Sequence, residues 1–161
     1  MNKAAIVLVF FFESWFGNKM LFVIERSKDS NQVLYKINLK NGGLNTEEPI
    51  EVCWLKREER NQKEPLSWIQ KKYAYGVNIL SSDSEMAVFQ FVSYKKQDFI
   101  VKKDGAGFFR VFTEMNHKKI QVKKIFVQIT GGSFWSPKIP RIDLMGIELN
   151  TNKAIIETLE L

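Results

Sequence analysis

Apolar and polar residues alternate with a period of two along much of the chain, which is the pattern of half-buried β-strands. The segments 20–26, 33–40 and 50–56 show this alternation most clearly. Asn41-Gly42-Gly43 follows the second segment, and these residue types favour a turn because they tolerate positive φ angles. The first third of the chain therefore predicts three strands.

The later part of the chain returns to strands from Val77 onward. The segment 86–94 is apolar on both faces, which predicts a central strand with cover on each side. A hairpin is expected where the glycine-containing turn 103–107 separates two apolar segments. Further strands are expected at 99–103, 108–113, 120–129, 139–149 and 154–159.

One segment has helical spacing instead. Pro65 suits the first turn of a helix, and Gly76 is placed to end it. Ile69 and Tyr73 recur at a spacing of four residues, which puts them on one helical face. The sequence therefore predicts one short helix at 65–75, stabilised mainly by packing on the sheet.

These elements together predict an all-β fold. Short strands joined by turn signals are typical of an antiparallel sandwich or a small barrel, here of about eight to ten strands. The charged run 56–64 is expected to be a solvated loop, and 20–161 a single β-rich domain. Strands do not alternate with helices, so a parallel nucleotide-binding sheet is not expected.

The segment 1–19 is a separate question. Lys3 precedes the apolar run 4–12, which resembles a secretory signal peptide and is too short to span a bilayer. The residues 13–17 offer no clean cleavage site. Three interpretations stay open: a leader, a buried part of the fold, or a translation start upstream of Met20. A working leader implies export to the periplasm or cell envelope; without one, the protein is expected in the cytoplasm.

Charge and composition narrow the partners. The net charge of +6 comes largely from lysine doublets, and neighbouring residues on a strand point to opposite faces. Such doublets do not build one basic stripe, so nucleic-acid binding is not expected. With one cysteine, Cys53, and one histidine, His117, the chain has no intrachain disulfide and no standard zinc set. Cys53 is expected to be a small buried hydrophobe.

The most distinctive loop is 131–137, Gly-Gly-Ser-Phe-Trp-Ser-Pro. It lacks the lysine and hydroxyl that close a phosphate loop, and it has no nucleophile elbow. The favoured interpretation is a glycine turn that buries Phe134 and Trp135 as an apolar plug. The alternative is a rim loop whose Trp135 packs on a ligand. No catalytic residue, metal or cofactor is predicted.

A candidate ligand-binding set combines polar side-chain ends with aromatic rings. The predicted helix brings several polar groups to one short element, and Gln128, within an apolar strand, would need a partner if buried. A solvent-open pocket where the set converges would favour ligand binding, whereas mutual burial would make it a polar network of the core. The set is Gln70, Tyr73, Tyr94, Gln128 and Trp135.

Four segments carry a resemblance to a known family: 21–28 (Leu-Phe-Val-Ile-Glu-Arg-Ser-Lys), the helix 66–76, 91–96, and 125–137 with its Gly-Gly-Ser-Phe-Trp stretch. Together with the strand that ends in Trp54, they resemble the uncharacterised bacterial family called domain of unknown function 4833. The resemblance implies a domain from about Met20 to the C-terminus. It also implies export, because members often look exported, and it implies no activity.

The function is therefore unknown from sequence, with three hypotheses. The leading one is a non-enzymatic binding or structural domain of the bacterial cell envelope, whose partner is an envelope component. The second is a lipocalin-like barrel that binds a small apolar ligand. The third is an enzyme whose scattered polar residues form a site that no sequence motif reveals.

Overall fold

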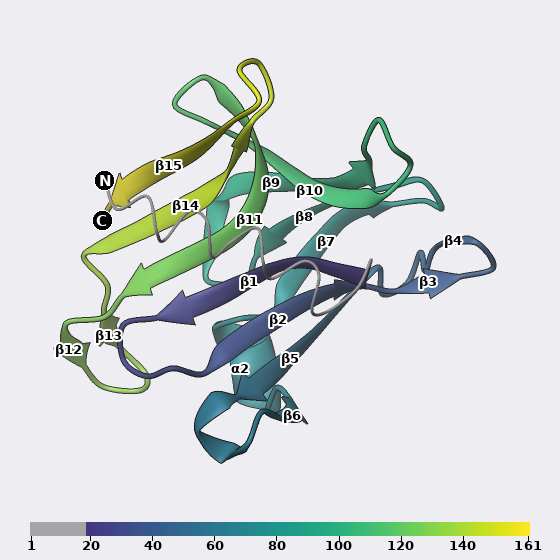
Figure 1. Ribbon diagram of the computed structural model, residues 1–161. Coiled ribbons are helices and arrows are strands. Elements are labelled where there is room, and N and C mark those ends of the chain that lie inside the picture. The colour runs from purple at the N-terminus through teal and green to yellow at the C-terminus, as the bar shows by residue number, and fades with distance from the viewer. Residues whose placement is uncertain (1–18) are drawn as a thin grey trace.

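A computed structural model describes residues 19–161. Its main feature is one eleven-stranded sheet that curls into a half-barrel (Figure 1). The first arm of the sheet consists of β1 (Met20–Arg26), β2 (Gln32–Ile37), β5 (Ile50–Lys56) and β6 (Gln62–Pro65). The second arm consists of β10 (Phe109–Met115), β9 (Tyr94–Lys103), β8 (Met86–Phe91) and β7 (Val77–Ser82).

The two arms meet at β11 (Lys118–Gln128). One edge of β11 pairs with β14 (Arg141–Glu148), which in turn pairs with β15 (Lys153–Glu160). The other edge is shared, because β10 pairs with the start of β11 and β1 pairs with its end. This division of one strand edge lets the arms diverge and face each other across a common interior.

The pairing of β1 with β11 is parallel, whereas the other pairs of the sheet are antiparallel. The expectation of an antiparallel sheet is therefore wrong at this one pair. β2 to β10 lie between β1 and β11 in sequence, so no local turn signal could indicate that β1 pairs with β11. The all-β class and the single short helix are confirmed.

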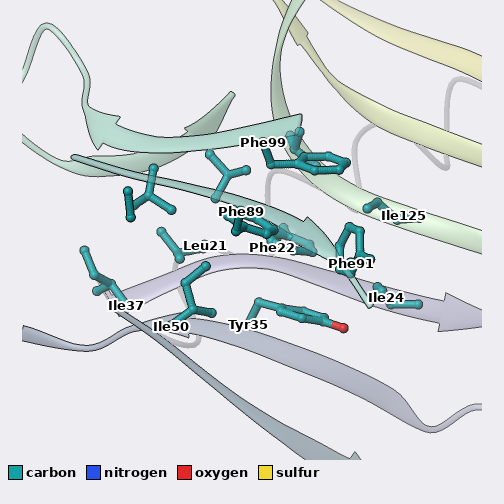
Figure 2. Packing of buried hydrophobic residues seen from close by; sticks show 14 of the residues in the cluster. Leu21, Phe22, Ile24, Tyr35, Ile37, Ile50, Phe89, Phe91, Phe99 and Ile125 are labelled. Carbon is teal, nitrogen blue, oxygen red and sulfur yellow. The ribbon is translucent and has the colours of Figure 1, made fainter. Parts of the chain in front are cut away.

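Aromatic rings fill the interior between the arms (Figure 2). On the first arm, Phe22 stacks on Tyr35 with ring centroids 4.3 Å apart. Across the interior, Phe22 lies 6.4 Å from Phe89 and 6.0 Å from Phe91, and Phe89 stacks on Phe99 at 5.3 Å. Stacked and edge-to-face pairs of this kind add stability beyond the area they bury. The two arms are thus joined by ring contacts as well as by β11.

The helix is α2 (Trp68–Tyr73), which is shorter than the expected 65–75. Pro65 does not open it but is the last residue of β6. The helix begins after Ser67 because a capping box forms there: the Ser67 hydroxyl accepts from the Gln70 backbone N–H, and the Gln70 side chain accepts from the Ser67 backbone N–H. The cap outweighs the preference of proline for a first turn.

The charged run 56–64 is only partly a loop. It holds a short 3₁₀ helix, η2 (Arg57–Glu59), and then enters β6, which pairs with the edge of β5. Its charges protect this edge of the sheet. Two small hairpins complete the fold: β3 (Leu39–Lys40) with β4 (Gly43–Leu44), and β12 (Gly131–Gly132) with β13 (Pro137–Lys138).

On the opposite face of the first arm lies a second apolar cluster, of Met20, Val23, Leu34 and Leu55, with half-buried Cys53 packed against it. Cys53 thus makes the small apolar contact that the sequence predicts, but it is half-buried and not fully buried. The predicted leader 1–19 lies outside the described residues except for its last position. Within the described part of the chain, no helix has the length and apolar character needed to cross a bilayer.

Candidate functional site

A cavity of about 730 Å³ lies at one end of the half-barrel. It is bounded by the ends of β1 and β11, the start of β14 and the β12–β13 hairpin, which lie together at the left of Figure 1. Residues of α2 line it as well. The aromatic core fills the rest of the interior, so the cavity is an end pocket and not a central channel. Most of its lining side chains are apolar.

One wall consists of matched rungs across neighbouring strands. Ile24, Ile125 and Leu144 lie opposite one another on β1, β11 and β14, and all three are buried. They form the floor of the cavity.

The next rung toward solvent contains Arg26 in place of an apolar residue. Its partners across β11, β14 and β15 are Val127, Ile142 and Leu159, and all four residues line the cavity. The wall is therefore aliphatic, with one cation at its β1 end.

Arg26 is held in place by several contacts. Its Nη2 donates to Asp29 Oδ2 at 2.6 Å, and its Nη1 donates to the Tyr75 hydroxyl at 3.1 Å. The guanidinium carbon lies 4.6 Å from the ring centroid of Trp54, a cation–π distance. Its Nε is buried and has no hydrogen-bond partner among the described residues. The guanidinium is thus fixed at the cavity wall with one donor unused.

Tyr75 connects the helix segment to the sheet. Its backbone carbonyl accepts a hydrogen bond from the hydroxyl of buried Tyr35 at 2.6 Å, and its ring packs edge-on against Trp54. Burial, and then the neighbouring Tyr75, raise the pKa of Tyr35 well above its ordinary value, so this hydroxyl remains a donor. The next residue, Gly76, has to be a glycine, because a Cβ at this position would collide with the Lys71 carbonyl.

Gln70 is tied to both the helix and the sheet. Its Oε1 accepts from the Ser67 backbone N–H and from Trp54 Nε1, each at 3.0 Å. Because both bonds use the carbonyl oxygen, the amide NH₂ is the group this side chain can offer to the cavity that it lines.

The second arm supplies the opposite wall of the cavity. Tyr94 and Gln97 line the cavity from β9, beside the buried rings of Phe91 and Phe99. The Gln97 amide donates to the Thr113 hydroxyl and to a backbone carbonyl of β10, both at 2.6 Å. Its amide hydrogens are thus committed to the protein.

The β12–β13 hairpin forms part of the rim. Backbone hydrogen bonds in both directions between Ser133 and Ser136 close its tip. Phe134 and Trp135 stand at this tip, 61% and 71% exposed, with their rings packed edge to face. The expectation of a buried plug is therefore wrong, because the hairpin carries these rings out over the cavity mouth. The rim-loop alternative describes the geometry that is found.

Four of the five residues in the predicted set, Gln70, Tyr73, Tyr94 and Trp135, line this one cavity. They come from α2, β9 and the hairpin. Gln128 is not among the lining residues. Its neighbour Val127 faces the cavity, and successive strand residues point to opposite faces, so Gln128 points away. Whether the four bind a ligand stays a prediction.

Sequence reasoning did not include Arg26 among the candidate site residues. The signal was present in the alternation of β1, because Ile24 and Arg26 share a face and the apolar face ends in a cation. Neither Cys53 nor His117 lines the cavity. Among residues 19–161, no group of three or more His, Cys, Asp or Glu could hold a metal ion.

The fold and cavity define a class: a half-barrel β-domain with an aromatic core and an apolar pocket at its open end. The chain belongs to the family described as Domain of unknown function (DUF4833), whose model matches residues 22–158. The family expected from the sequence is therefore confirmed. No curated protein matches the chain, and no solved structure does.

Proposed function

We propose that this domain binds a small, mainly apolar molecule in the end cavity, without chemical turnover. The observation that carries the proposal is the cavity itself, whose volume of about 730 Å³ falls within the range of ligand pockets, about 300–1,000 Å³. Its apolar walls and few fixed polar groups are also typical of such pockets. Gln70, Tyr73, Tyr94 and Trp135 are the proposed contacts.

The shape supports an end-binding variant of the lipocalin-like hypothesis. A closed barrel of this kind holds its ligand along the barrel axis. Here the sheet stays open, and Phe22, Phe89 and Phe99 occupy the interior, so the space for a ligand is displaced to the end beside α2. Rim aromatics that are already exposed can then close over a bound molecule without unfolding any strand.

The residue types in the lining support binding over catalysis. Among the described residues that line the cavity there is no Asp, Glu, His or Cys. The hydroxyls of Ser93, Ser133 and Ser136 thus have no side-chain carboxylate or imidazole beside them in the lining to act as a general base. A protein that only retains its ligand needs no such group.

The proposal is tested with N-phenyl-1-naphthylamine, an uncharged apolar dye whose emission rises in apolar surroundings. The wild-type protein is expected to bind the dye saturably at one site. Ile129→Trp, which fills the cavity, should abolish this binding. Leu80→Trp adds the same ring on exposed β7 and should bind as wild type does. Equal binding by both variants, or none by the wild type, contradicts the proposal.

We also propose that the protein works in the cell envelope. The support lies in the sequence, where Lys3 and the apolar run 4–12 have the order of a signal peptide. The full chain should be recovered outside the cytoplasm after expression in a bacterium, and deletion of residues 1–19 should retain it inside. Recovery of the full chain in the cytoplasm alone would overturn this proposal and leave ligand binding untouched.

A further inference from the structure

We propose that the ligand of this cavity is a single-chain amphiphile with a carboxylate head, such as a fatty acid. In this arrangement the head lies at Arg26 and Lys28, and the tail lies on the aliphatic floor. The inference rests on the proposed binding function and names the class of molecule that the cavity takes.

The first support is a gradient along one face of β1 and the residues that follow it. Phe22 lies in the aromatic core, Ile24 in the cavity floor, Arg26 at the wall and Lys28 at the exposed mouth. Figure 2 shows Ile24 and Ile125 beside Phe91, at the end of the core where the cavity begins. Polarity therefore changes along one direction, from apolar floor to cationic mouth, as a molecule with a tail and a charged head requires.

The second support is the sign of the charges. Arg26 and Lys28 are the charged residues in the described lining, which contains no carboxylate, although Asp29 outside the lining pairs with Arg26. The net positive charge is therefore that of Lys28 at the exposed mouth, and it favours an anion over a cation of the same shape. An uncharged ligand would form no ionic interaction with these cations.

The third support is the state of each cation. Asp29 already neutralises Arg26, whose buried Nε still lacks a partner among the described residues. No described residue forms an ion pair with Lys28, which is exposed. The site thus offers one uncompensated positive charge, on Lys28, beside a guanidinium that its own contacts already hold in place. This combination matches a head with a single negative charge and acceptor oxygens better than it matches a doubly charged phosphate.

The aliphatic wall matches an extended tail. Val127, Ile142 and Leu159 continue the apolar surface from the floor toward Arg26, because they lie on the same rung of the sheet. A chain laid across these strands, along the rung, would bury its length against Val127, Ile142 and Leu159 and place its head at the cation. The rim rings of Phe134 and Trp135 would then cover it.

The test compares three probes with the same alkyl chain, dodecanoate, dodecanol and dodecylamine, as monomers that displace N-phenyl-1-naphthylamine. Dodecanoate is expected to bind about tenfold more tightly than dodecanol, the effect of about one charged hydrogen bond, and dodecylamine should bind least. Lys28→Gln should reduce the preference for the acid over the alcohol by about threefold. Lys138→Gln is the control: it removes a cation from β13 that does not line the cavity, and it should leave the preference for the acid unchanged.

Added salt gives a readout that needs no variant, since it should narrow the gap between acid and alcohol by screening the exposed Lys28. Arg26→Gln should narrow it further, provided that its circular dichroism spectrum matches that of the wild type. Equal affinity for acid and alcohol, or a preference for the amine, overturns this inference while leaving the proposed function intact. If none of the probes displaces the dye, and the dye itself does not bind, the proposed function fails as well.

Discussion

The indole N–H of Trp54 donates a 3.0 Å hydrogen bond to the side-chain oxygen of Gln70 and so joins β5 to α2. The same oxygen caps the helix through the Ser67 backbone N–H. A six-residue helix has little intrinsic stability, so its position depends on such bonds. The Gln70 side chain therefore joins the helix wall of the cavity to the first arm, together with the contacts of Tyr75.

Gln70→Leu is expected to lower the free energy of unfolding by about 1–3 kcal/mol, because it removes the side-chain half of the capping box and leaves Trp54 Nε1 without its acceptor. Gln70→Glu keeps an acceptor for both donors and should retain most of the stability. Urea unfolding monitored by far-ultraviolet circular dichroism measures both values. If the two variants lose equal stability, the bond to Trp54 does not hold the helix.

Gly132→Ala should disturb the rim hairpin. Gly132 has a φ of +84°, and an added Cβ would lie 2.8 Å from the Lys138 nitrogen and collide with the Ser136 carbonyl. The left-handed conformation alone costs a non-glycine residue about 1–2 kcal/mol. Faster amide hydrogen exchange at 131–138 is the expected result. Gly105→Ala, where an added Cβ meets open space, is the control. It should leave amide exchange unchanged at 131–138 and in its own turn, 103–107.

Trp135→Ala should separate binding from folding. The ring is 71% exposed, so its loss should change the free energy of unfolding by less than about 0.5 kcal/mol. Dye affinity should fall, because the rim ring covers the cavity mouth. Leu80→Ala, another exposed apolar residue, is the matched control for both measurements. A Trp135→Ala protein that is markedly less stable would show that the ring has a structural role instead.

Glu157, on β15, predicts that the stability of the fold depends on pH. Hydrogen bonds from Lys118 Nζ and Asn116 Nδ2 hold the pKa of this carboxyl below its ordinary value, although its burial acts in the opposite direction. Its contribution to stability is therefore fully present above the unfolded-state pKa of about 4.3, and it is lost as pH falls through the lower folded-state pKa.

Glu157→Gln should accordingly be less stable than the wild type near pH 7, and the difference should shrink as pH falls below about 4. Glu160→Gln removes an exposed carboxylate near the end of the same strand and serves as the control. Thermal unfolding midpoints measured across the acid range test this. A gap between wild type and Glu157→Gln that stays constant at every pH would contradict the assigned pKa shift.

Local pattern was enough for most of the strands. The segments 20–26 and 50–56 coincide with β1 and β5 because period-two alternation there matches a sheet with one face on the aromatic core. The helix was found but misjudged at its start, since the proline signal at Pro65 competed with the Ser67 cap. Four of the five candidate ligand contacts line one cavity, and their role in binding stays a prediction.

The sequence by itself thus determined the all-β class, the family and most strand positions, because these follow from local alternation, turn residues and specific stretches such as 125–137. Only the tertiary structure decided that β1 pairs in parallel with β11, since that contact joins segments about a hundred residues apart. The same pairing places Arg26 level with Val127 and Ile142 at the cavity wall. Gln128, one residue further along β11, faces away because successive strand residues point to opposite faces. Register across distant strands, and not residue type alone, thus decides which side chains share a site.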